Sequence, residues 1–441
     1  MKGNEHMDII NRIKQYEEEL ISLRRYFHMY PELSGAEDNT CRRITDFLTK
    51  LGIDCTLVPD GGILAFIHGC APGKTVLLRA DVDALPICED PTNLTGPKTS
   101  VSSVPGVSHA CGHDAHTAML LAAARVLKDR CRLWAGTVIL MFERGEEKTT
   151  NCIKIFRYME ENGIHVDSSF AVHMHAELES GKIAVNDGAV MASNVCFDVT
   201  VKGVGGHGSR PDFAANPIDC FVAFHNALNS VPMRKISPFH PLTFSICRIQ
   251  SGFTNNVIPD ELFFRGSARF FDKNDGVIFK QTLTETLDHV TKIYGCTYEY
   301  TLLRGPCMPV INHAGCAGLL RKALGKEIGS ERIISCEPKM GSETFGKTIA
   351  MWPGVYAHVG TRSERKGTGA DHHNPKFDID EDVLKYGAAA YAVYAEAFLN
   401  ADIDVSDCAY PGSFADMYEE QGVPKEFVEY LQRKTDTLHL A

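Results

Sequence analysis

Short, largely apolar runs alternate with helical stretches in the first part of the chain, and this alternation limits the possible folds most strongly. Strands buried on both faces give such runs, whereas strands with one wet face alternate polar and apolar residues. The runs cover residues 63–67, 76–78, 138–142 and 170–173, and helical stretches such as 115–127 lie between them. The pattern predicts an α/β fold with a largely parallel sheet covered by helices.

The first 52 residues are expected to be helical. Apolar residues recur at spacings of three and four, as one face of a helix requires; they are Ile9, Ile13, Tyr16, Leu20, Leu23 and Phe27. Pro31 breaks this pattern, and a second helix is expected to run to about Gly52. Glycine suits the position after a helix because it adopts a positive φ at little cost.

The pattern changes near residue 193, where strands and helices no longer follow a strict strand-helix-strand order. Strands are expected at 195–201, 242–249 and 262–271, and helices at 217–229 and 275–294. The α/β pattern returns from about residue 313 and ends in a helix over 380–399. We therefore expect a smaller α+β domain inserted into a larger, discontinuous α/β domain.

The expected boundaries follow from these changes. The discontinuous domain comprises 1–193 and 307–402, and the inserted α+β domain comprises 194–306. Residues 403–441 form an extension with one helix candidate at 426–432, and the sequence reveals no role for it. A length of 441 residues agrees with two domains, because single cores rarely grow that large.

Charge and hydropathy exclude several classes of protein. The formal net charge is -11, which argues against a nucleic-acid surface, because phosphate binding needs clustered Lys and Arg. No apolar run reaches the roughly 20 residues that cross a bilayer. Residues 1–8 are polar, without the apolar segment of a secretory signal. We expect a cytoplasmic enzyme with no membrane partner.

The cysteines indicate reduced thiols. There are 15 of them, without any Cys-x-x-Cys pair, in a chain that shows no secretory signal. Such a count favours free thiols over a disulfide framework. Cys41, Cys220 and Cys247 have apolar neighbours and are expected in the core.

Several metal-binding side chains are concentrated in one short segment. His109, Cys111, His113, Asp114 and His116 lie within eight residues, just before and within a predicted helix. A thiolate with imidazoles favours zinc, nickel, cobalt or manganese over magnesium or calcium. A single Cys-x-His is more often a buried cysteine beside a hydrogen-bonded histidine. The density of the segment favours a metal site, but the spacing does not decide which members bind.

Paired carboxylates follow the strand expected at 136–142. Glu146 and Glu147 stand where the sites of α/β proteins usually lie, at the carboxyl end of a strand. One of the pair is suited to bind metal while the other takes a proton from water. Taken alone, such a pair is usually a solvated turn.

Further candidate ligands also follow predicted strands. Asp81 and Asp83 are two residues apart and share one face if the segment is extended. They are suited to bind metal or to hold a ligand histidine, and either one alone is more often a turn residue. Two histidine pairs complete the candidates, and the sequence does not show which member points inward; they are His173 with His175 and His372 with His373.

These motifs together resemble a known family. The chain is similar to the aminoacylase, hippurate hydrolase and auxin-conjugate (IAA-amino acid) hydrolase branch of the binuclear carboxypeptidase–aminoacylase metallopeptidases. The similarity covers roughly residues 18–398 and includes the segments 23–28, 79–86, 109–117, 146–147, 203–211, 256–259, 340–343 and 373–377. It implies a catalytic domain with a mixed sheet covered by helices, and an inserted α+β domain.

The resemblance also implies roles for particular residues. It implies two divalent metal ions per subunit (Mn, Zn, Co or Ni). The side chains that it assigns as their ligands are Cys111, His113, Glu147, His173 and His373. It places Glu146 as general acid and base, with Asp83 as a supporting carboxylate. It implies that the insert is a lid or dimerisation domain, through which the chain forms a homodimer or a higher homo-oligomer. His207 of the insert is expected to reach the active site of a partner subunit, and Asn256 and Arg269 to bind the substrate carboxylate.

The sequence departs from the usual pattern of that family at three places along the chain. Residues 143–145 are Glu-Arg-Gly where Gln-Pro-Ala is usual, Thr344 stands where Asp is usual, and His175 stands where an aromatic residue is common. These changes concern the pocket and the surroundings of the ligands, so they affect the identity of the substrate more than metal binding.

The expected function is hydrolysis of the amide bond of an N-acyl amino acid by metal-activated water. A dipeptidase or carboxypeptidase using the same site is the close alternative. A non-catalytic protein that binds such conjugates is a second, although no expected catalytic residue is missing. A cysteine hydrolase using Cys111 with His113 is disfavoured, because a nucleophile takes its base across space and not from two residues along the chain.

Overall fold

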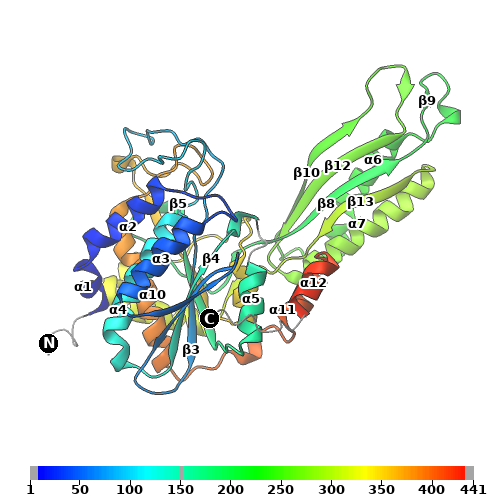
Figure 1. The fold of residues 1–441 in the computed structure, drawn as a ribbon. Helices are drawn as coiled ribbons and strands as arrows, with labels where there is room; N and C mark the ends of the chain where they lie inside the picture. Colours follow the sequence, from blue (N-terminus) through cyan, green and yellow to red (C-terminus); the bar gives the residue numbers. More distant parts are fainter. Residues whose placement is uncertain (1–7, 149–151, 433–441) are drawn as a thin grey trace.

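The computed structural model describes residues 8–148 and 152–432, so the polar residues 1–7 and the end of the extension lie outside the described residues. Figure 1 shows two units, a larger one around an eight-stranded sheet and a smaller, elongated one around a four-stranded sheet. The chain leaves the larger unit, builds the smaller one, and returns to complete the first sheet.

The larger sheet is mixed, with strand order β1-β2-β4-β3-β5-β16-β6-β15. The central strands β4, β3, β5 and β16 are parallel. On one side β2 pairs antiparallel with β4, and β1 pairs antiparallel with β2 and so runs in the direction of the central strands. On the other side β6 pairs antiparallel with β16, and β15 pairs parallel with β6. The strands are β1 (Asp54–Val58), β2 (Gly62–His68), β3 (Thr75–Asp81), β4 (Thr137–Glu143), β5 (Ser168–Glu179), β6 (Ile183–Ala184), β15 (Ile333–Ile334) and β16 (Val355–Arg362). The prediction of a largely parallel sheet is therefore correct for the centre, whereas β2, β6 and β15 run opposite to the central strands.

Both faces of this sheet are buried, which explains the continuous apolar runs. Val76 and Leu78 of β3 belong to the core on one face, and Leu77 to the core on the other. The first core includes residues of α1 (Ile9–Lys14), α2 (Glu17–Met29), α3 (Asp38–Lys50), α4 (His113–Arg130), α8 (Ala314–Ile328) and α10 (Leu384–Asn400). Smaller cores on the opposite face include residues of α5 (Cys152–Glu161), α9 (Phe345–Met351), β7 (Gly188–Met191) and β14 (Val310–Asn312).

The N-terminal helix predicted from periodicity is divided in two. A turn at residues 15–16 separates α1 from α2, and the apolar spacing continues across it, so periodicity does not reveal the break. The prediction for Gly52 is confirmed, because it follows the end of α3 with a φ of 65°.

The smaller unit has its own core. Its sheet has the order β10-β12-β8-β13, with all neighbours antiparallel. Phe197, Phe264 and Phe279 are fully buried between this sheet and its helices. The elements are β8 (Ser193–Lys202), β9 (Gly206–His207), α6 (Pro217–Ser230), β10 (Leu242–Ser251), β11 (Val257–Ile258), β12 (Glu261–Phe270), α7 (Lys273–Ile293) and β13 (Thr297–Arg304). Cys247 was expected in the core and is exposed, because β10 is an edge strand; Cys41 and Cys220 are buried as expected.

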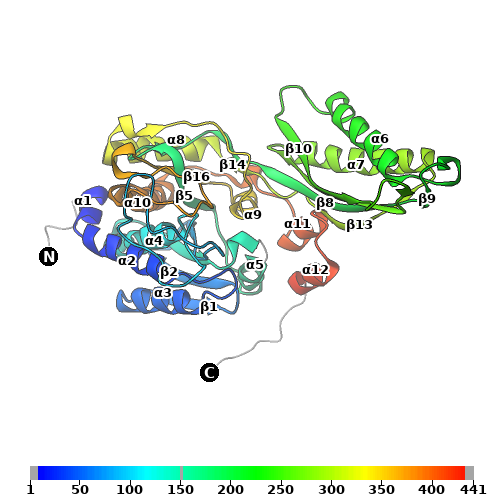
Figure 2. The same cartoon turned by 90° about the horizontal axis from the view of Figure 1, so that it is seen from above.

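The extension contacts both units. It forms α11 (Phe414–Glu420) and α12 (Lys425–Gln432), which Figure 2 shows between the units. Phe414 stacks on Phe156 of the larger unit at a centroid distance of 4.0 Å. Gly305, just after β13, donates its N–H to the carbonyl of Gln421 at 2.8 Å. The helix predicted at 426–432 is confirmed, and α11 was not expected.

Within the part of the chain that the structure describes, no helix combines the length and the apolar character that crossing a membrane requires.

Candidate metal centre

The predicted ligands are positioned by the carboxyl ends of parallel strands and by the start of α4. β3 ends at Asp81, β4 ends at Glu143, and His173 lies within β5 between its parallel neighbours β3 and β16. Gly112 precedes α4 with a φ of 90°, and a Cβ there would lie 3.0 Å from Met174. Glycine is therefore required between Cys111 and His113 to bring the start of the helix against β5.

The structure brings the five predicted ligands together. The Cys111 Sγ lies 3.6 Å from the Nε2 of His173. Oε1 of Glu147 lies 3.2 Å from Nε2 of His373 and 4.0 Å from Nε2 of His113. Atoms of this kind at these separations are suited to share cations between them.

The surrounding hydrogen bonds leave one nitrogen of each buried histidine free for a cation. His113 uses Nδ1 towards Asp83, at 3.0 Å, and within the described part of the chain its buried Nε2 has no hydrogen-bond partner. His173 donates from Nδ1 to the carbonyl of Met174 at 2.7 Å, which leaves the lone pair on Nε2. Such bonds to the outer nitrogen fix the tautomer of ligand histidines. A thiol, imidazoles and a carboxylate fit divalent ions from manganese to zinc.

Asp83 has the position of a supporting carboxylate. Besides His113, it accepts hydrogen bonds from the Ser34 hydroxyl at 2.6 Å and from the backbone N–H of Glu147 at 3.0 Å. It thereby fixes two of the predicted ligands relative to each other, without lying among the ligand atoms.

His373, and not His372, faces Glu147, as the resemblance implied. His373 has a φ of 62°, which is unusual for a residue with a side chain and costs conformational energy. Its N–H donates to the Ala110 carbonyl at 2.8 Å, which ties it to the Cys111 segment. His372 instead accepts a long hydrogen bond, 3.4 Å, from the N–H of Ala176.

Glu146 is buried beside the ligands. Its Oε1 accepts a hydrogen bond from the backbone N–H of Thr344 at 3.1 Å. Burial raises the pKa of Glu146 well above its usual value, and the nearby Glu343 and Glu147 raise it further. A carboxyl group with a raised pKa in such a place is suited to exchange protons with a reacting group.

The departures at 143 and 344 belong to one buried network around Arg79. Arg79 contacts Glu143 at 2.7 Å, Asp81 at 2.7 Å and Glu343 at 3.0 Å. Thr344 accepts from Arg79 at 2.8 Å and donates to Glu143 at 2.9 Å. The carboxylate of Glu143 is thus paired with a cation, and Thr344 connects this network to Glu146.

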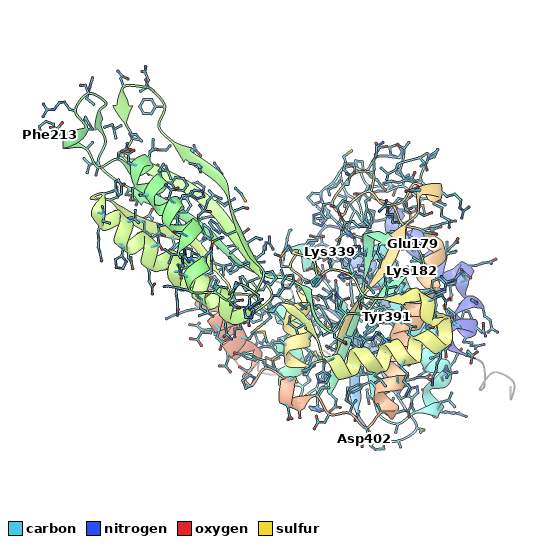
Figure 3. The ribbon with its side chains drawn as sticks, turned by 180° about the vertical axis from the view of Figure 1, so that it is seen from behind. Glu179, Lys182, Phe213, Lys339, Tyr391 and Asp402 are labelled. Carbon is cyan, nitrogen blue, oxygen red and sulfur yellow. The ribbon has the colours of Figure 1, made fainter. Side chains whose placement is uncertain are left out.

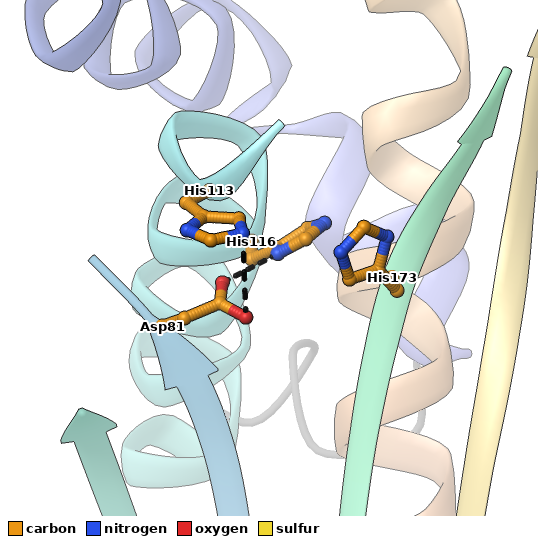
Figure 4. A group of neighbouring side chains, drawn as sticks. All are labelled: Asp81, His113, His116 and His173. Atoms are coloured by element: carbon orange, nitrogen blue, oxygen red, sulfur yellow. Dashed lines mark hydrogen bonds and ion pairs between the residues drawn. The ribbon is translucent and has the colours of Figure 1, made fainter. Parts of the chain in front are cut away.

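Sequence reasoning left other members of the 109–116 segment open. The structure pairs His116 and Asp114 with other groups of the protein, whereas neither ring nitrogen of the buried His109 has a hydrogen-bond partner among the described residues. Figure 4 shows the Asp81 carboxylate below the neighbouring rings of His113 and His116, within reach of both. His116 bonds to Asp81 at 2.6 Å and accepts the N–H of Met174 at 2.8 Å, so both its nitrogens are used. Asp114 is buried against Arg24 at 2.9 Å. Burial lowers the pKa of His109 to about 4.

The three predicted substrate residues lie in different places. Arg269 donates to the Ser342 hydroxyl at 3.2 Å, at the junction of the two units. His207 and Asn256 lie together near β9 and β11, since Gly208 donates to the Asn256 carbonyl at 2.9 Å. Figure 1 shows β9 at the end of the smaller unit farthest from the larger sheet, and Phe213, close to β9 along the chain, lies at the same end in Figure 3. The structure therefore does not bring His207 and Asn256 to the metal centre of their own chain.

Comparison with known proteins defines the family. Residues 77–397 match peptidase family M20/M25/M40, and the chain belongs to this family. Thermostable carboxypeptidase 1 of Saccharolobus solfataricus is 36% identical over 405 residues, which cover 89% of this chain and 100% of that protein. N-acetylcysteine deacetylase of Bacillus subtilis is 32% identical over 384 residues, which cover 87% of this chain and 97% of that protein.

A solved structure extends the comparison to the fold. The Bacillus subtilis YXEP protein, described as a dinuclear metal-binding peptidase of the M20 family, matches with a TM-score of 0.73 and 28% identity. The match covers 88% of this chain and 99% of that one. The predictions of an amide-bond hydrolase and of a mixed α/β fold are confirmed at the level of the family.

Proposed function

We propose that the chain hydrolyses the amide bond of N-acyl amino acids, as a member of the aminoacylase and hippurate hydrolase branch of its family. The observation that carries the proposal is the convergence of five metal-binding side chains beside the buried carboxyl of Glu146, whose distances are given above. The deacetylase among the relatives supports an N-acylated substrate.

Two divalent cations bound by Cys111, His113, Glu147, His173 and His373 would supply positive charge that acidifies the attacking water and polarises the scissile carbonyl. Glu146 takes the proton from that water and returns it to the leaving amine. The Thr344 N–H holds one oxygen of Glu146, which leaves the other for the proton. The products are a carboxylate and a free amino acid.

Arg269 is proposed to bind the carboxylate of the amino-acid part. Its guanidinium lies where the smaller unit meets the Ser342 segment of the larger one, and a planar pair of donors matches a carboxylate. Ser342 also accepts from the side chain of Asn194, so its hydroxyl position is fixed.

We propose a homodimer in which His207 and Asn256 complete the site of the partner. Both lie far from the metal centre of their own chain, at an end with exposed apolar side chains, such as Phe253 at 88% exposed and Val257 at 41% exposed. His207 would stabilise the oxyanion of the tetrahedral intermediate.

Mixed dimers test this arrangement. His207→Ala and Glu146→Ala homodimers are each expected to lose about 10²-fold or more of kcat. Co-expression with two affinity tags yields mixed dimers in which one site has both residues and the other has neither. These should recover activity close to half that of the wild type per dimer, measured with a chromogenic N-acyl amino acid. Mixed dimers without recovered activity would show that His207 does not act across the dimer.

A substrate panel with chelation tests the function itself. Treatment with a chelator is expected to abolish hydrolysis of N-acetyl and N-benzoyl amino acids, and Mn²⁺, Zn²⁺, Co²⁺ or Ni²⁺ should restore it, because the proposed site needs two cations. Activity on unacylated dipeptides alone would favour the second candidate, a carboxypeptidase or dipeptidase, which the 36% identical carboxypeptidase supports. Binding of conjugates without turnover would indicate a non-catalytic protein. Hydrolysis that resists chelators but stops on thiol alkylation would indicate a cysteine hydrolase.

A further inference from the structure

A second group of metal-binding side chains lies outside the centre described above. It consists of His175 on β5, His358 on β16 and Cys336 in the segment between β15 and α9. One donor atom from each lies within 4.8 Å of the other two, and none of the three belongs to the proposed catalytic ligands.

The sheet positions the two histidines. β5 and β16 are parallel neighbours, with His358 opposite His173 and Gly360 opposite His175. His175 and His358 therefore project from the same face of the sheet as diagonal neighbours. Their ring centroids are 4.9 Å apart with planes at 86°. Both are buried, at 5% and 3% exposed, and Nδ1 of His175 has no hydrogen-bond partner among the residues that the structure describes.

The backbone of Cys336 is held in place by the side chain of Asn186. Cys336 donates its N–H to the side-chain oxygen of Asn186 at 3.0 Å and accepts from the same amide at 2.8 Å. Its Sγ lies 3.9 Å from Nδ1 of His358. In a tetrahedral zinc site the sulfur and nitrogen ligands are about 3.6 Å apart, so only a small movement is needed for both to bind one ion.

The group opens onto a cavity of about 480 Å³ whose wall includes Glu177, Lys339 and Asp371. Lys339, labelled in Figure 3, is paired with Glu177 at 3.4 Å, so its positive charge is opposed by a carboxylate. The cavity gives an ion a route of entry and leaves a fourth coordination position for water or a carboxylate.

We propose that His175, His358 and Cys336 form a third metal site, which takes one zinc-class ion per subunit in addition to the proposed catalytic pair. Two imidazoles and a thiolate select zinc, cobalt or copper over magnesium and calcium. A bound ion ties the segment at Cys336 to β5 and β16. The same segment leads to Ser342, Glu343 and Thr344, so the ion also restrains the residues that contact Arg269 and Glu146.

Metal analysis of the zinc-saturated protein tests the site. Cys336→Ser and His358→Gln are expected to retain one ion per subunit fewer than the wild type after exhaustive dialysis. Cys70→Ser is the matched control, because Cys70 is an exposed thiol outside these groups. Equal zinc contents in the wild type and both site variants would overturn the proposal.

Cobalt spectroscopy gives a second measurement that does not depend on the stability of a single variant. Cys111→Ser removes the thiol of the catalytic group and leaves Cys336 in place. Its Co²⁺ form is expected to keep a thiolate-to-cobalt charge-transfer band, and the double variant Cys111→Ser with Cys336→Ser should lose it. A Cys111→Ser protein that shows no such band overturns the site, whatever the outcome for the proposed amidohydrolase activity.

Discussion

Replacing Glu146 by alanine is expected to lower kcat for an N-acyl amino acid by about 10²–10⁴-fold or more, while the metal content stays at the wild-type level. The reason is the position of Glu146, which is buried beside the proposed ligands and held by the Thr344 N–H, and whose proposed role is proton transfer and not metal binding. Steady-state kinetics and metal analysis of the same preparation measure the two quantities.

Two further variants sharpen this result. Glu146→Gln keeps the shape and the hydrogen bond from Thr344 but removes the proton-accepting oxygen, so it should be nearly as inactive. Glu18→Ala, which changes an exposed glutamate on α2, should leave turnover and metal content unchanged. Substantial hydrolysis by metal-loaded Glu146→Ala would refute the role of Glu146 as the base.

Among the substitutions considered, Arg79→Met is expected to lower the free energy of unfolding most. Arg79 is 1% exposed and is the cation between the carboxylates of Asp81, Glu143 and Glu343. Removing one partner of a buried ionic network leaves uncompensated charge and costs about 3–5 kcal/mol. Thermal unfolding of the chelated protein, followed by circular dichroism, measures the decrease in Tm without a contribution from metal binding.

An exposed arginine gives the control for this loss. Arg362 pairs with Glu364 at 3.7 Å, with both side chains largely exposed, and such pairs contribute about 0–1 kcal/mol. Arg362→Met should therefore unfold close to the wild-type Tm. Equal Tm values for Arg79→Met and Arg362→Met would mean that the buried network does not stabilise the larger unit.

Local patterns predict the central strands and most helices because burial on both faces, or along one stripe, leaves a direct trace in the sequence. The runs at 76–78 and 138–142 are examples, and both are buried. Strand direction leaves no such trace, so the apolar runs do not reveal that β2, β6 and β15 run opposite to the central strands, although the resemblance implied a mixed sheet. β13 and β16 were also missed.

The candidate site, too, could be predicted from local patterns only in part. The segment from His109 to His116 stands out by composition, but spacing does not distinguish Cys111 and His113 from His116. The distinction depends on contacts between distant segments, such as that of His116 with Asp81. The resemblance selected His373 over His372, and the geometry agrees, since His373 faces Glu147. The roles of these residues stay predictions until the variants are measured.

The path of the chain through the larger sheet has a consequence for synthesis on the ribosome. β5 lies between β3 and β16, yet the whole smaller unit and α8 are translated between β5 and β16. During that interval β5 presents an unpaired edge with apolar residues on both sides, which is the kind of surface that associates with other chains. The smaller unit is continuous in sequence and has its own core, so it can fold during this delay. Completion of the larger core must wait for β16 and α10, and the nascent protein therefore depends on rapid closure, or on a chaperone, at this one strand.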